Sequence, residues 1–287
     1  MSPEEIAAFL EKRGHRVVQT ASCWWYNEYH QDRLYHSFPM HRAVNPSPEE
    51  IAELFQRIPR ALGFRFVGPP QSGGFDSFIW VRRKPYDLTA LNSKSRNQTR
   101  RGLERCEVKK ISWDELLISA RNAHQDTMGR HQQNGAGSLG FGIELGECPA
   151  YEAWGAFIDG RLAAYTVTLW IEDWVHILLQ RSVTAELKFY PNNALVFSVV
   201  SELLSRPGVT AVCFGLESLV SLDSLEHFKS GMGFTKEPVN QHFVLARWAR
   251  PLLNPVTGGS INLLASLLPG NLRLQKVAGI YRIAQKS

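Results

Sequence analysis

The residues best suited to proton transfer follow a buried strand predicted over residues 209–215. Glu217 and Asp223 lie in the loop after that strand, and Lys229 lies in the short helix that comes next. A carboxylate at the end of a strand is well placed to remove a proton from a substrate. A lysine in a partly closed cleft can donate a proton or stabilise negative charge. The alternatives are ordinary: Asp223 caps the helix, Glu217 is solvated and Lys229 lies on an exposed turn.

His176 is a second candidate base, on a strand predicted over residues 175–182. An imidazole changes charge near neutral pH and can accept a proton from a substrate. A single histidine on an apolar strand is, however, more often a hydrogen-bonded core residue. The four cysteines, at positions 23, 106, 148 and 213, lie far apart and lack zinc-type CxxC spacing, so no metal site is predicted.

A strongly basic segment covers residues 94–110, with seven basic residues against two acidic ones. The difference equals the net charge of the whole chain, +5, so the rest of the sequence is close to balanced. On the helix predicted within this segment, Arg96 and Arg100 share one face, as do Arg101 and Arg105. Such a face can bind the phosphates of a nucleotide-linked substrate or of a tRNA end. The alternative is a solvated basic face.

A second possible phosphate site precedes a helix predicted from about residue 192 to 205. The N-terminus of a helix offers free backbone N–H groups and a partial positive charge. Four side chains could add to this site: Lys188, Tyr190, Asn192 and Asn193. The alternative is a well-capped helix that packs its apolar residues on a sheet.

The elements that must position these residues alternate between helices and strands, which predicts an α/β protein. Helices are predicted near residues 3–13, 48–58, 93–105, 113–126 and 192–205. Strands are predicted near residues 16–29, 34–38, 64–67, 75–81, 108–111, 153–158, 162–171, 175–182, 209–215 and 242–248. Asp159-Gly160 lies between two apolar runs and predicts a hairpin turn.

The order strand, loop, helix and strand over residues 209–234 resembles the last third of a GNAT-type acyltransferase fold. Phe228-Lys229 followed by Gly233-Phe234 resembles the FemAB-like branch of that fold. The resemblance implies a mixed central sheet flanked by helices, in two GNAT-like halves. Residues 1–105 would form a reduced N-terminal half, residues 106–250 the C-terminal acyltransferase domain, and residues 251–287 a tail.

The resemblance also implies a reaction. In GNAT-type enzymes two strands splay apart, here residues 175–182 and 209–215, and backbone N–H groups between them hold an ester or thioester carbonyl. An amine would attack an acyl or aminoacyl group carried by acyl-CoA or by an aminoacyl-tRNA. Glu217 or His176 would take the proton, and Lys229 would assist the leaving group. Phosphates would be held by Arg96, Arg100, Arg101 and Lys188.

One loop departs from the GNAT pattern. The glycine-rich loop that grips the pyrophosphate of coenzyme A is replaced here by residues 188–194, Lys-Phe-Tyr-Pro-Asn-Asn-Ala. The usual grip on coenzyme A is therefore missing. A different class of function stays open, namely a catalytically silent module that keeps the fold and uses its cleft for binding alone.

The composition is that of an ordinary globular protein, with 44% hydrophobic and 21% charged residues. Glu4, Glu5 and Glu11 lie where a secretory signal would need a positive end and an apolar run, so a cytoplasmic location is expected. The apolar stretch 162–171 is too short to span a bilayer. The expected partners are a small-molecule or peptide amine acceptor and, if the donor is an aminoacyl-tRNA, tRNA. The apolar tail segment 261–268 could touch a membrane surface, although docking on the protein is the simpler interpretation.

Overall fold

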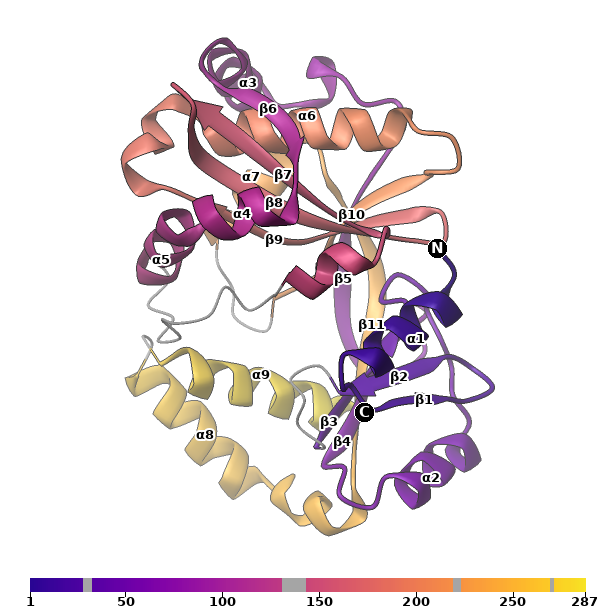
Figure 1. The fold of residues 1–287 in the computed structure, drawn as a ribbon. Coiled ribbons are helices and arrows are strands. Elements are labelled where there is room, and N and C mark those ends of the chain that lie inside the picture. Colours follow the sequence, from indigo (N-terminus) through magenta and orange to yellow (C-terminus); the bar gives the residue numbers. More distant parts are fainter. Residues whose placement is uncertain (28–32, 131–142, 219–222, 269–270) are drawn as a thin grey trace. The chain divides into compact units, whose positions relative to one another are not determined.

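The computed structural model describes all residues except 28–32, 131–142, 219–222 and 269–270, and the chain forms two compact units (Figure 1). Unit 1 consists of Met1 and residues 80–215 and 222–235. Unit 2 consists of residues 2–79, 216–221 and 236–287. Each unit combines segments from both sides of residue 105, and the division into residues 1–105, 106–250 and 251–287 stays a prediction. Among the described residues, no helix is long and apolar enough to cross a membrane.

Unit 1 is built on a sheet with the strand order β10-β9-β8-β7-β6. Its strands are β6 (Glu107–Ile111), β7 (Tyr151–Ile158), β8 (Arg161–Ile171), β9 (Trp174–Ser182) and β10 (Ala211–Leu216). Its helices are η1 (Leu88–Ala90), α3 (Ser93–Arg105), α4 (Trp113–Ser119), α5 (Arg121–Arg130), η2 (Ile143–Glu147), η3 (Thr184–Phe189), α6 (Pro191–Ser205) and α7 (Asp223–Gly231). In Figure 1, α3 and α6 lie on one face of this sheet, and α4 and α5 lie on the other.

The centre of unit 1 follows from its apolar sequence. β7 and β8 are buried on both faces and are therefore nearly continuous apolar runs. Asp159 and Gly160 join them with φ angles of 49° and 73°, as a two-residue type I′ hairpin requires, and this confirms the predicted turn. α6 begins at a proline, which lacks the N–H that a first helical residue leaves unpaired, and it packs between the sheet and α3.

Unit 2 contains a sheet with the order β1-β2-β3-β4-β11-β5. Its strands are β1 (Val17–Gln19), β2 (Trp24–Asn27), β3 (Leu34–Phe38), β4 (Gly63–Gly68), β11 (Thr235–Leu245) and β5 (Phe75–Arg83), of which β5 continues into unit 1. Its helices are α1 (Pro3–Lys12), α2 (Pro48–Arg57), η4 (Arg247–Leu252), α8 (Pro255–Leu267) and α9 (Leu272–Lys286).

Two helices cover opposite faces of the unit 2 sheet. Leu54 of α2 packs in one cluster with Phe64 of β4, whereas Ile283 of α9 packs in another with Phe243 of β11. Phe64 pairs with Val244 across the two strands, so the neighbouring Phe243 points to the other face. The face under α9 also carries the buried polar residues described below.

The sequence placed two strands differently from the structure. The strand expected over residues 16–29 is the hairpin of β1 and β2, because the backbone turns back between Thr20 and Cys23, whose N–H and C=O groups are 3.0 Å apart. Ser22 in this turn donates to the Glu50 carboxylate from its N–H (3.0 Å) and its hydroxyl (2.6 Å). The strand expected at residues 242–248 is β11, which starts earlier and ends at Leu245. The predicted α/β architecture with a mixed sheet is confirmed.

Candidate active site

β9 and β10 separate in the way that the GNAT resemblance implies. Their parallel ladder covers three residue pairs and ends where His176 lies opposite Cys213. Beyond that point β9 continues to Ser182 and stays paired with β8, while no further pairing with β10 is found in the described part of the chain. Gly215 in β10 has a φ of 81°, which a glycine adopts at little cost, and this bends the end of the strand. The edge of β9 that faces this opening is therefore free of the ladder.

Lys229 lies at this opening. Its Nζ donates to the carbonyl oxygen of Phe214 at 3.2 Å and lies 5.4 Å from the centre of the Phe214 ring. Phe214 is the first residue of β10 after the last pair with β9. The side chain is only 8% exposed, and its burial lowers the pKa to about 8. Lys229 is thus a buried cation that is hydrogen-bonded to a strand carbonyl, and not a solvated lysine on a helix turn.

His176, the second candidate base, lies at the closed end of the same opening. It belongs to the last β9–β10 pair and is 3% exposed. Its burial agrees with the core alternative raised by the sequence, and its role as a base stays a prediction.

The N-terminus of α6 is a poor phosphate site. Tyr190 precedes the helix in the left-handed conformation, and Pro191 has no N–H. The N–H groups of Asn193 and Ala194 donate to the Tyr190 carbonyl at 3.1 and 3.2 Å. α3 covers this end closely, because a Cβ added to its Gly102 would lie 2.7 Å from the same carbonyl oxygen. Few backbone donors remain for a pyrophosphate group.

The two asparagines of α6 hold the helix in place. Asn192 accepts from Gln180 Nε2 at 3.0 Å and donates to Ser182 Oγ at 3.2 Å, which ties α6 to the end of β9. Asn193 is buried, and its amide lies 3.5 Å from the sulfur of Met232. These contacts are structural, and a role of either side chain in substrate binding stays a prediction.

The basic residues of α3 divide into two groups. Arg96 is engaged by the backbone, since it donates to the carbonyls of Leu88 (2.9 Å) and Leu91 (3.0 Å) around η1. Arg100 and Arg101 are exposed. Arg101 lies over the Tyr190 ring at 5.0 Å from its centre and donates to the Tyr190 hydroxyl at 3.3 Å.

Further cations gather on the adjoining 3-10 helix. Arg105 and Lys188 both lie by the Phe189 ring, at 5.9 and 5.0 Å from its centre. We call the exposed cations and the two rings between them the α3 patch: Arg100, Arg101, Arg105, Lys188, Phe189 and Tyr190. Positive charge interleaved with aromatic rings is typical of surfaces that bind single-stranded nucleic acid.

Glu217 lies in unit 2, at the end of a buried chain of hydrogen bonds. Its Oε2 accepts from the Ser77 hydroxyl at 2.8 Å. Ser77 in turn accepts from Gln241 Nε2 at 2.7 Å, and Gln241 Oε1 accepts from Arg65 Nε at 3.2 Å. Next to Arg65 on β3, burial and the positive charge of Arg65 lower the pKa of His36 to about 3, so this imidazole is neutral. These hydrogen bonds fix Oε2 of the Glu217 carboxylate.

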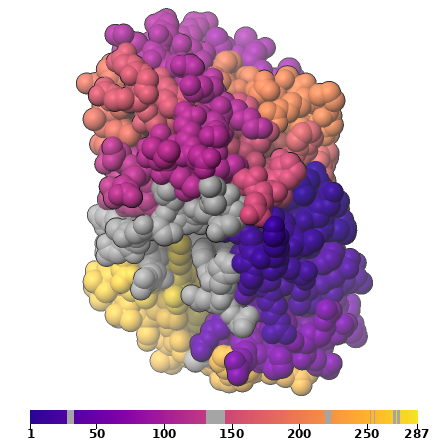
Figure 2. All heavy atoms as spheres, viewed as in Figure 1, coloured from indigo at the N-terminus to yellow at the C-terminus, as the bar shows by residue number. Residues whose placement is uncertain are grey.

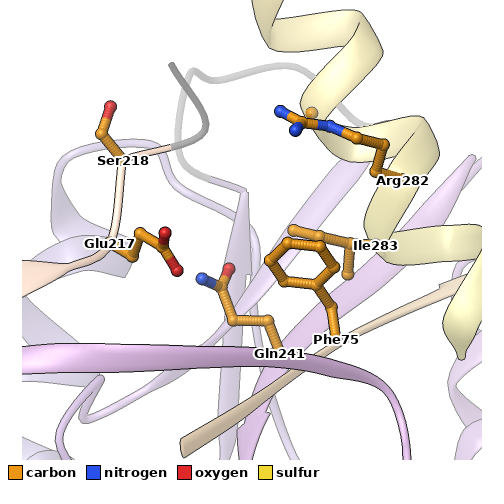
Figure 3. Close-up of a pocket in the computed structure, with 7 residues that line it drawn as sticks. Phe75, Glu217, Ser218, Gln241, Arg282 and Ile283 are labelled. Atoms are coloured by element: carbon orange, nitrogen blue, oxygen red, sulfur yellow. The ribbon is translucent and has the colours of Figure 1, made fainter. Parts of the chain in front are cut away.

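The Glu217 carboxylate borders a small cavity under α9 (Figure 3). The cavity has a volume of about 80 Å³ and is also lined by Phe75, Ser218, Arg282 and Ile283. Figure 3 shows the Gln241 amide directed toward Glu217, and Arg282 reaching in from α9 above the Phe75 ring. A carboxylate with one oxygen fixed and an apolar wall beside it can bind an ammonium group and accept its proton.

The residues that hold Glu217 were not predicted from the sequence. Ser77, Gln241 and Arg65 are far from it in sequence, and no short motif links them. A signal did exist in residues 240–242, Asn-Gln-His, because three successive polar residues are buried in β11. Buried polar residues on a strand need partners, and a run of them predicts a polar network.

Metal ions need sets of ligating side chains. Within the described ranges, no group of three or more His, Cys, Asp and Glu side chains could hold a metal ion. All four cysteines are buried, and none of them belongs to a disulfide. Burial raises the pKa of the Cys23 thiol to about 12 and that of Cys106 to about 11, so neither is a ready nucleophile.

The splayed strands and the helix between them form the GNAT-like fold that the sequence predicted, and solved structures share this fold. The solved structure of FemX is similar, with a TM-score of 0.58 at 11% identity over 86% of this chain and 92% of that one. So is L-PGS from Bacillus licheniformis, with a TM-score of 0.54 at 14% identity over 94% and 96% of the two chains. The C-terminal domain of a protein described as a lysylphosphatidylglycerol synthetase from Agrobacterium fabrum gives a TM-score of 0.55 at 12% identity over 88% of each chain. No protein-family model and no curated protein sequence matches the chain.

Proposed function

We propose that this protein transfers an aminoacyl group from an aminoacyl-tRNA to an amine acceptor, either a small molecule or a peptide. The observation that carries the proposal is Lys229, a buried cation held where β9 and β10 separate. Two proteins with this fold, FemX and a lysylphosphatidylglycerol synthetase, add support, since the second is named for an aminoacylated product.

The reaction requires a proton donor, a proton acceptor and groups that stabilise negative charge on the carbonyl oxygen. The acceptor nitrogen attacks the aminoacyl ester carbonyl, a C–N bond forms, and the C–O bond to the tRNA ribose breaks. Lys229 gives its proton to the departing ribose oxygen and then takes up the proton that the nitrogen loses as the amide forms. Glu217 stays the base that the sequence predicts for the first proton of the acceptor ammonium. Backbone N–H groups on the open edge of β9 stabilise the negative charge on the carbonyl oxygen.

The donor is proposed to be tRNA rather than coenzyme A. In a GNAT enzyme the N-terminus of α6 would hold the coenzyme A pyrophosphate. Here Gly102 of α3 lies against this end of the helix, and the N–H groups of Asn193 and Ala194 donate to the Tyr190 carbonyl. The α3 patch instead offers four cations and two aromatic rings to the phosphates and bases of an RNA end.

The test compares donors on the full-length chain. Charged tRNA carrying labelled amino acids is measured by filter retention, and acetyl-CoA by its effect on the thermal midpoint. We expect saturable, salt-dependent retention of tRNA and no stabilisation by acetyl-CoA, followed by transfer of label to members of a mixed pool of amines. Stabilisation by acetyl-CoA would overturn the donor assignment. Retention of charged tRNA without label transfer would favour the silent binding module.

A further inference from the structure

An uncharged helix at the end of the chain exposes a stripe of apolar side chains. α8 contains no charged residue in its 13 positions. Val256, Leu263, Leu264 and Leu267 are all exposed, with Val256 at 78% and Leu267 at 66%. Their spacing of seven, one and three residues places them on one face of the helix. A contiguous exposed apolar stripe of this kind marks an interaction surface.

The exposure of the stripe does not come from a loosely attached helix. The opposite face of α8 is docked on α9, where Ala265 is buried and its carbonyl accepts from Gln275 Nε2 at 2.6 Å. Gly258 lies so close to Tyr281 that an added Cβ would be 2.6 Å from the ring. The Tyr281 hydroxyl donates to the carbonyl of Asn254, the N-cap of α8, at 2.5 Å. α8 therefore has a fixed inner face and an exposed outer one.

The segment of sequence that carries this stripe has charges of one sign. After Glu237 the sequence contains no acidic residue, so the last 50 residues carry six positive charges and no negative one. Exposed Trp248 of η4 lies between exposed Arg247 and Arg250, and Lys276 is exposed on α9. A tryptophan beside arginines suits the boundary between lipid tails and headgroups. Figure 2 shows the C-terminal segment in yellow as part of the molecular surface.

We propose that η4, α8 and α9 form a docking surface for a bilayer that contains anionic phospholipids. The α8 stripe enters the boundary between headgroups and acyl chains, and Arg247, Arg250 and Lys276 bind the negatively charged headgroups. The positive charge favours an anionic bilayer over a second copy of the chain, because two copies of this surface would bring like charges together. The proposal does not depend on the reaction proposed above.

The experiment measures co-sedimentation of the full-length chain with vesicles. One set is phosphatidylcholine alone, and in the other about a third of the lipid is phosphatidylglycerol. We expect binding to the anionic vesicles and at least tenfold weaker binding for the variant Leu263→Asn/Leu267→Asn. Ile118→Asn is the matched control, because Ile118 is 82% exposed on α4 of unit 1, and it is expected to bind as the unchanged protein does.

A second pair of variants tests the charge. Arg247→Gln/Arg250→Gln is expected to lose the preference for anionic vesicles, whereas Arg121→Gln on α5 keeps it. Circular dichroism checks that each variant is folded, and all of these positions are exposed. Equal sedimentation with both vesicle types would overturn the proposal. So would a dimer in solution that the leucine variant dissociates, because the stripe would then be an interface between copies of the chain.

Discussion

Lys229 is the residue whose ionisation can be followed most directly. Its burial lowers its pKa to about 8, and the form that donates a proton to the leaving group is the charged one. The rate of aminoacyl transfer should therefore be constant below this value and fall as the pH rises through about 8. Lys229→Met keeps most of the side-chain volume and should slow the transfer on the order of 100-fold. Initial rates between pH 6 and 10 provide the measurement.

Two controls separate chemistry from packing. Lys229→Arg keeps the positive charge, because a guanidinium stays protonated throughout this pH range, so its remaining activity should lack the decline near pH 8. Lys12→Met changes an exposed lysine at the end of α1 and should leave both the rate and the profile unchanged. A Lys229→Met enzyme with normal rates would remove Lys229 from the mechanism.

Glu217 gives a second prediction at the same scale. Glu217→Gln keeps the shape and the hydrogen bond from Ser77 but cannot accept a proton, so kcat should fall on the order of 100-fold while the fold persists. Ser77→Ala frees the carboxylate from its anchor and should produce a smaller loss. Glu53→Gln, on an exposed part of α2, serves as the control. Loss of the same size in Glu53→Gln and Glu217→Gln would show that neither effect belongs to the reaction.

These residues also show where sequence reasoning succeeds at this scale. Lys229 could be selected because Phe228, Gly233 and Phe234 mark its helix within six positions. Arg96 could not be separated from Arg100, since only the structure shows that its guanidinium is engaged by the carbonyls around η1. Spacing along a helix reports a shared face, but the partners of a long side chain depend on the loop that folds back onto it.

At the scale of elements, the contact between α3 and α6 can be tested with glycines. Gly102→Ala would place a Cβ 2.7 Å from the Tyr190 carbonyl, so α3 must move away from α6. We expect a loss of about 1–3 kcal/mol in the free energy of unfolding. At Gly129 in α5, no described residue outside its own helix turn lies within 4 Å of an ideal Cβ, and Gly129→Ala should instead stabilise the protein by about 0.5–1 kcal/mol. Chemical denaturation of both variants measures the difference.

The outcome would also report on the donor. If Gly102→Ala unfolded no more easily than the unchanged chain, α3 would be able to shift from the N-terminus of α6, and the argument against coenzyme A at that site would fail. Binding of acetyl-CoA to this variant alone would lead to the same conclusion.

Element order was more predictable than element partners. The separation of β9 and β10 could be anticipated because the order of elements along the chain resembles the GNAT fold, in which these two strands splay apart. The hydrogen bonds from Ser77 to Glu217 and from Gln241 to Ser77 join residues 140 and 164 positions apart, and no local pattern encodes them. The turn at Ser22 was missed for the same reason, since Glu50 of α2 holds it.

At the scale of the molecule, positive charge is concentrated in two separate stretches of sequence. The first is residues 94–110, which supply three cations of the α3 patch in unit 1, and the second is the acid-free segment of the last 50 residues in unit 2. The net charge of +5 conceals this division, because acidic residues elsewhere balance the rest. The two proposals assign different anionic partners to the two regions, which makes them separable by experiment.

Salt dependence provides that separation. If the α3 patch contacts tRNA phosphates, the logarithm of the binding constant falls linearly with the logarithm of the salt concentration. Arg100→Gln/Arg101→Gln/Arg105→Gln should then weaken tRNA binding and reduce the slope by about one for each contact removed. Arg247→Gln/Arg250→Gln removes two cations from unit 2 and should leave the slope unchanged while it reduces binding to anionic vesicles. Equal loss of tRNA binding in the two variants would mean that the net charge of the protein, and not the α3 patch, attracts the nucleic acid.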